Sequence, residues 1–171
     1  MNRRIVAWVS VLFAIFLITG CATHTRAVDQ NILSSQSWHG RLAMQVEAHP
    51  EEPNAQRQSF SASFELLGTP QAGELTFFTP LGSTAAAIRW TPDLATLESQ
   101  GQTRMFAGLS PLIHNLLGAD VPVAALFGWL AGQDLPADGW QVNLAQFGQG
   151  KITAQRLFPL PQAQLRLVLE P

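Results

Sequence analysis

Charged residues are scarce in this sequence. Asp, Glu, Lys and Arg make up only 13% of the 171 residues, while 47% are apolar; an ordinary soluble domain has about a quarter charged residues. The basic residues are scattered and the formal net charge is −2, so the composition predicts no nucleic-acid-binding surface. The shortage of charge favours either a large apolar core or an interior that accommodates something apolar.

Residues and motifs that carry enzymatic or metal chemistry are also few. Cys21 is the single cysteine, which excludes an intrachain disulfide. None of the four histidines has metal-ligand spacing to another, and HExxH, GxSxG and glycine-rich phosphate loops are absent. We therefore expect no enzymatic activity, no metal site and no cofactor.

The N-terminal segment is typical of a bacterial secretion signal. Arg3 and Arg4 precede an apolar run, Ile5–Ile18, which is shorter than the ~20 residues that a transmembrane helix needs. The run ends in ITGC, whose branched aliphatic, two small residues and cysteine resemble the lipobox of bacterial lipoproteins. A signal anchor, or an ordinary signal with a chance cysteine, is the alternative.

The lipobox divides the chain into three parts. Residues 1–20 are the predicted signal peptide, residues 21–37 a lipidated tether with a possible short helix, and residues 38–171 the folded domain. Cys21 is the predicted site of lipid attachment, and two or three acyl chains would anchor the protein stably where one would not. Ala22 follows the cysteine instead of aspartate, which by this resemblance indicates the periplasmic face of the outer membrane of a Gram-negative bacterium.

From Trp38 onward, apolar and polar residues alternate with the period of half-buried strands. About nine strands are expected, and their short turns require an antiparallel sheet. Two short apolar helices, between Ser110 and Gly118 and between Asp120 and Gly132, follow the sixth strand. We predict a mainly β fold (α+β): a single antiparallel sheet curled into an unclosed barrel, with the helices as a lid or lining of its concave face.

Such a sheet and its helices would form a concave apolar surface. The candidate cavity residues are aromatic and aliphatic side chains on the expected apolar faces: Met44, Phe60, Phe64, Phe77, Ile88, Trp90, Leu112, Leu116, Leu126, Trp129 and Leu130. From the residues alone, the favoured alternative is that the same side chains fill a solid core, because apolar stripes are usually core.

The stretch Thr79–Gly82, TPLG, suits a type I turn with proline second and glycine fourth. Leu81 is third, a position that usually faces water. Single exposed leucines are common, so a leucine there needs no special explanation by itself.

Four motifs, together with the lipobox, follow the order and spacing of the LolB family. They are GRLAM (Gly40–Met44), PLGST (Pro80–Thr84), VPVAALFGWLAG (Val121–Gly132) and GWQV (Gly139–Val142). The resemblance covers roughly Trp38 to Leu169 and implies an unclosed antiparallel β-barrel with a helical lid. It also implies a receptor that accepts lipoproteins from the soluble periplasmic carrier LolA, holds their acyl chains in a hydrophobic cavity and inserts them into the inner leaflet of the outer membrane.

The resemblance gives the turn a role as well. In the family the leucine of the PLG turn protrudes and is needed for membrane insertion of the cargo, which implies that role for Leu81, flanked by Pro80 and Gly82. The partners implied are LolA, acylated cargo lipoproteins and outer-membrane lipid, and we expect a monomer. Two alternatives remain: a structural or assembly lipoprotein of the outer membrane with a filled core, and a binder of another small apolar ligand.

Overall fold

The computed structural model describes residues 36–51, 54–117 and 120–171. The predicted signal peptide, Cys21 and most of the predicted tether lie outside these residues. Gln36 and Ser37 belong to the first strand, because they pair with Gly68 and Leu67 of the second. The expected short helix therefore does not include them, and the first strand already contains the two residues before Trp38.

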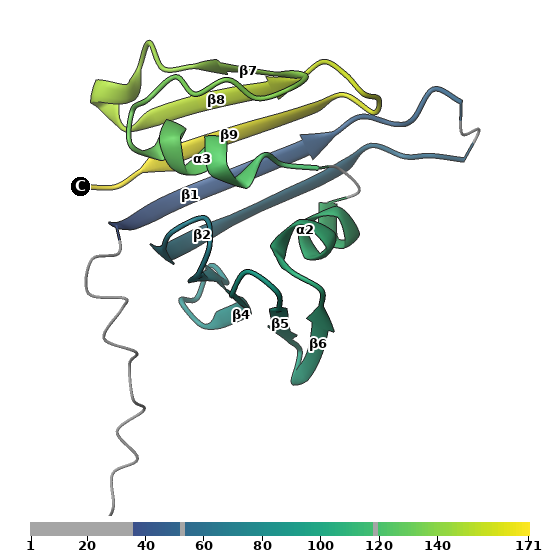
Figure 1. Cartoon of the computed structure of the whole chain (residues 1–171), viewed down its shortest axis with the longest axis vertical. Coiled ribbons are helices and arrows are strands. Elements are labelled where there is room, and N and C mark those ends of the chain that lie inside the picture. The colour runs from purple at the N-terminus through teal and green to yellow at the C-terminus, as the bar shows by residue number, and fades with distance from the viewer. Residues whose placement is uncertain (1–35, 52–53, 118–119) are drawn as a thin grey trace, which may run out of the picture.

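Nine antiparallel strands form one sheet in the order β6-β5-β4-β3-β2-β1-β9-β8-β7 (Figure 1). The first and last strands pair in its middle, where Met44 faces Leu165. β6 and β7 are its two edges, so the sheet curls without closing, as predicted. The strands are β1 (Gln36–Val46), β2 (Gln58–Gly68), β3 (Gly73–Phe78), β4 (Thr84–Trp90), β5 (Ala95–Ser99), β6 (Gln102–Phe106), β7 (Trp140–Asn143), β8 (Lys151–Arg156) and β9 (Ala163–Leu169).

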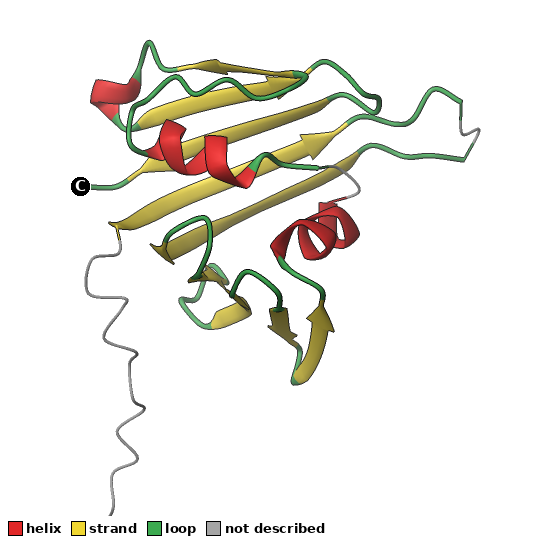
Figure 2. Cartoon of the chain, viewed as in Figure 1, coloured by secondary structure: helices red, strands yellow, loops and turns green. Residues whose placement is uncertain are grey.

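Two α-helices, α2 (Leu109–Leu117) and α3 (Val123–Leu130), follow β6 and lie over the concave side of the sheet (Figure 2). A short 3-10 helix, η3 (Phe147–Gln149), connects β7 to β8. The predicted strand count and the position of the helices are thus confirmed. Among the described residues, no helix combines the length and the apolar character needed to cross a membrane.

The helix α3 is firmly packed against the sheet. The residues of α3 are apolar on every face of the helix, and Phe127, Trp129 and Leu130 are buried. The indole N–H of Trp38 on β1 donates to the carbonyl of Leu130 at 3.0 Å, and the ring of Trp38 meets Phe127 edge-on at 5.5 Å. A buried indole needs such a partner for its N–H, so this bond fixes α3 to the middle of the sheet.

The helix α2 is held differently. Leu112 is its one fully buried side chain among those described, while Ser110, His114 and Asn115 face outward. The apolar stripe of α2 is therefore only partly used for packing. Between α2, α3 and the curled sheet, space remains that the protein's own side chains do not fill.

Candidate functional site

An apolar cavity of about 310 Å³ lies between the concave face of the sheet and the two helices. Its volume falls within the range of small-molecule sites, roughly 300–1,000 Å³. Fifteen residues line it, and thirteen of them are apolar: Leu42, Met44, Phe60, Leu75, Phe77, Ala86, Ile88, Leu97, Ile113, Leu116, Val121, Leu126 and Leu165. The two polar lining residues are Ser99 and Arg104.

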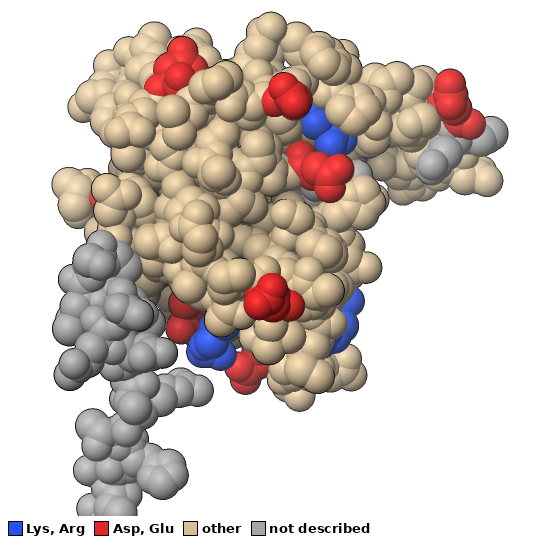
Figure 3. All heavy atoms as spheres, viewed as in Figure 1, with Lys and Arg blue, Asp and Glu red and all other residues tan. Residues whose placement is uncertain are grey.

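The cavity opens to solvent on one side. Phe60 and Leu116 line it and are nevertheless 41% and 36% exposed. The rings of Phe60 and Phe77 meet edge-on at 5.1 Å and form part of this wall. Figure 3 shows that uncharged residues form most of the face that carries the helices. A long apolar ligand can therefore enter without displacing buried charge.

The structure separates the eleven predicted cavity residues into two sets. Six line the cavity: Met44, Phe60, Phe77, Ile88, Leu116 and Leu126. Five are buried in the core without lining it: Phe64, Trp90, Leu112, Trp129 and Leu130. Trp129 and Trp90 are fixed there by hydrogen bonds from their indole N–H groups to the carbonyls of Leu135 (2.9 Å) and Thr69 (3.2 Å).

Sequence reasoning missed nine of the lining residues. Three of them were detectable by strand alternation, since Leu42, Leu75 and Ala86 each lie two residues from a predicted lining residue on the same strand. Ile113 belongs to the apolar stripe of α2. Arg104 carried no such signal, because a charged residue in a short strand is normally expected to face solvent.

The Thr79–Gly82 segment is a tight turn between β3 and β4. The N–H of Gly82 donates to the carbonyl of Thr79 at 2.9 Å, and the N–H of Thr79 donates to the carbonyl of Ser83 at 2.8 Å. Gly82 has a φ of +81°, which only glycine adopts at no steric cost, and its position matches the left-handed residue that follows a turn in many hairpins. Leu81 is 94% exposed, so it does not pack against its own sheet.

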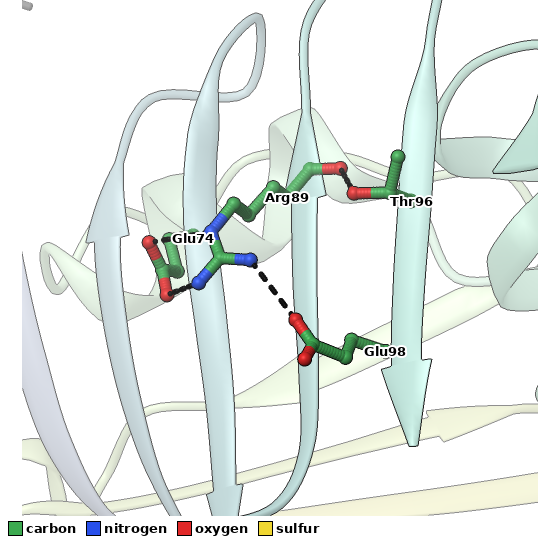
Figure 4. A network of polar contacts seen from close by, with 4 residues as sticks. All are labelled: Glu74, Arg89, Thr96 and Glu98. Carbon is green, nitrogen blue, oxygen red and sulfur yellow. Dashed lines mark hydrogen bonds and ion pairs between the residues drawn. The ribbon is translucent and has the colours of Figure 1, made fainter. Parts of the chain in front are cut away.

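The outer face of the sheet carries a different, polar hollow. The guanidinium of Arg89 donates to both carboxylate oxygens of Glu74, at 2.9 and 3.1 Å, and to Glu98 at 3.5 Å (Figure 4). The hydrogen bond to Glu74 is the main reason why the pKa of Arg89 is raised, although partial burial opposes it. These side chains are 38–60% exposed, and such surface pairs contribute only about 0–1 kcal/mol each to stability.

Among the arginines that the structure describes, one is buried. Arg156 on β8 is 4% exposed, its Nη2 donates to the carbonyl of Pro161 at 2.7 Å, and its Nε has no partner among the described residues. Burial lowers the pKa of Arg156, and the charge of Asp120 opposes this. Within the described ranges, no three His, Cys, Asp or Glu side chains group together as metal ligands would.

Comparison with known proteins gives one consistent family. A family model described as "Outer membrane lipoprotein LolB" matches residues 34–169. The chain is also similar to the outer-membrane lipoproteins LolB of Bordetella petrii (28% identical, covering 90% of this chain and 86% of the relative), Vibrio vulnificus (29%; 84% and 71%) and Shewanella loihica (27%; 70% and 55%). The chain thus spans only about half the length of the Shewanella relative. Because the family model covers nearly the whole described domain, the protein belongs to the LolB family of outer-membrane lipoproteins.

Proposed function

We propose that this protein receives lipoproteins from the periplasmic carrier LolA, holds their acyl chains in the cavity between the sheet and α2 and α3, and inserts them into the inner leaflet of the outer membrane. The observation that carries the proposal is the unfilled apolar cavity, in which thirteen of fifteen lining residues are apolar. A structural lipoprotein has no need of such a space, because filling it would add stability.

The transfer of acyl chains from the carrier to this protein and on to the bilayer needs no energy source in the receptor. Acyl chains that leave one apolar cavity for another exchange equivalent surroundings, so the hydrophobic contribution nearly cancels. Delivery to the bilayer is favourable because burial there is complete. The cavity of this protein is open at Phe60 and Leu116, which leaves part of a bound chain in contact with water and favours its release into lipid.

Two further features would contact the membrane, one as an anchor and the other as an inserting side chain. Cys21, as the lipid-attachment site, would keep the protein at the membrane. The turn Pro80–Gly82 would present Leu81 to the acyl region of the bilayer, since Leu81 is 94% exposed and Gly82 fixes the turn. Burial of one leucine contributes only about 2 kcal/mol, which is too little to anchor a protein but enough to orient it or to disturb lipid packing locally.

Depletion of the protein followed by cell fractionation tests this function directly. The proposal predicts that newly made outer-membrane lipoproteins accumulate in the soluble periplasmic fraction, in complex with the carrier. Normal delivery of lipoproteins after depletion contradicts it and would favour a structural role, or the binding of another small apolar ligand.

A further inference from the structure

Arg104 is the one charged side chain among the fifteen residues that line the cavity. It lies on β6 directly opposite Leu97 of β5, which also lines the cavity, so both side chains face the concave side of the sheet. Ser99, two residues after Leu97 on β5, is the other polar lining residue; it also borders the outer hollow, and its hydroxyl donates to the carbonyl of Ala85 at 3.3 Å. Since β6 is an edge strand, the polar end of the cavity lies at this edge of the sheet.

The guanidinium of Arg104 is only partly engaged within the protein. Its Nη1 donates to Oδ1 of Asn115 on α2 at 3.4 Å, a long hydrogen bond, and its central carbon lies 5.9 Å from the ring centroid of Phe106. None of the ion pairs between described residues includes Arg104. A guanidinium carries five N–H donors, so most of them are available to a ligand. Because Arg104 is also exposed, these donors lie at the mouth of the cavity rather than within it.

We infer that Arg104 binds the polar head of the acyl ligand, by donating hydrogen bonds to the carbonyl oxygens of the esters and amide to which the acyl chains are attached. This rests on the proposed function, because it needs acyl chains in the cavity. In an apolar pocket a small number of polar groups fixes the orientation of the ligand. The chains would extend towards Ile88 and Leu126, and the polypeptide of the cargo would lie outside the mouth of the cavity.

Acyl-ester carbonyls occur both in the diacylglyceryl cysteine of a lipoprotein and in a glycerophospholipid. The test therefore compares three ligands: a synthetic tripalmitoylated cysteinyl peptide, dipalmitoylphosphatidylglycerol, and diphenylhexatriene, a fluorescent hydrocarbon without hydrogen-bond acceptors. The mature chain from residue 21 is used, with Cys21→Ala so that its own lipid does not compete. Arg104→Met removes the donors and keeps a long side chain. Arg89→Met is the matched control, because Arg89 also lies in the sheet but faces its outer side.

Arg104→Met is expected to weaken binding of the lipopeptide about tenfold, as loss of a hydrogen bond from a charged donor does. Binding of the hydrocarbon should change by less than about twofold, and Arg89→Met should leave both ligands at wild-type affinity to the same limit. A parallel loss for the phospholipid assigns recognition to the acyl ester; retained phospholipid binding assigns it to the amide of the lipoprotein.

Two results would overturn the inference and leave the proposed function standing. One is wild-type affinity of Arg104→Met for the lipopeptide. The other is an equal loss for lipopeptide and hydrocarbon, which would mean that Arg104 only shapes the cavity. Failure of the unsubstituted protein to bind any of the three ligands contradicts the proposed function itself, and the inference with it.

Discussion

Replacing Leu81 by glutamate should impair insertion of cargo into the membrane while leaving the stability of the fold and the loading of cargo unchanged. The side chain is 94% exposed, so the substitution should change the free energy of unfolding by no more than about 0.5 kcal/mol. Acceptance of cargo from the carrier should also be unchanged, since Leu81 does not line the cavity.

Delivery should fall sharply. Insertion into lipid removes nearly all of the Leu81 surface from water, which contributes about 2 kcal/mol, or roughly 30-fold in an equilibrium constant. A carboxylate at the same position adds an unfavourable cost of burial in the bilayer. We therefore expect Leu81→Glu to load lipoprotein normally and to transfer it to liposomes at least about 30-fold more slowly than wild type.

The assay follows a radiolabelled lipoprotein from the carrier to the protein and then to sedimented liposomes. Leu94→Glu is the matched control, because Leu94 is an exposed leucine (45%) in the turn at the other end of β4. It should load and deliver like wild type. Delivery by Leu81→Glu at the wild-type rate, or an equal loss of loading and delivery, would refute the assignment of Leu81 to insertion.

Four further predictions concern the cavity, the core, the outer face and the helices. Ala86→Leu should reduce the space in the cavity and weaken binding of an acylated peptide several-fold in a fluorescence titration, with little change in the urea midpoint. Trp129→Ala should lower the free energy of unfolding by about 3–5 kcal/mol in the same denaturation experiment, because it empties a site that is 1% exposed and removes the bond to Leu135. Glu74→Gln should cost less than about 1 kcal/mol, and the difference should shrink as salt is added. Backbone amides of α2 should exchange with deuterium faster than those of α3 in a mass-spectrometric time course, because α3 buries five residues and α2 far fewer.

Much of this architecture could be predicted from local patterns. In the second strand, Phe64 and Leu66 alternate with Ser63 and Glu65, and the structure buries the first pair and pairs the strand antiparallel on both sides. The tetrad Thr79–Gly82 likewise specified a turn, because proline and glycine restrict the backbone in ways that depend little on the rest of the fold.

The division between core and cavity could not be predicted, because it depends on where the helices lie. Phe60 and Phe64 share one face of β2, yet Phe64 is 3% exposed and Phe60 lines the open wall at 41%. The start of β1 at Gln36 was missed for a related reason. The preceding residues show no alternation, and the strand extends to Gln36 because Gly68 and Leu67 of β2 offer hydrogen-bonding partners.

The central claim is that acyl chains occupy the space between the concave face of the sheet and the two helices. A lipopeptide whose acyl chain carries a diazirine near its end tests this most directly, since irradiation attaches the chain to whatever it touches. The account predicts adducts, located by mass spectrometry, on cavity residues such as Ile88, Ile113 and Leu126. Adducts confined to the outer face, around Thr76 and Glu98, or the absence of any specific adduct at saturating ligand, would contradict it.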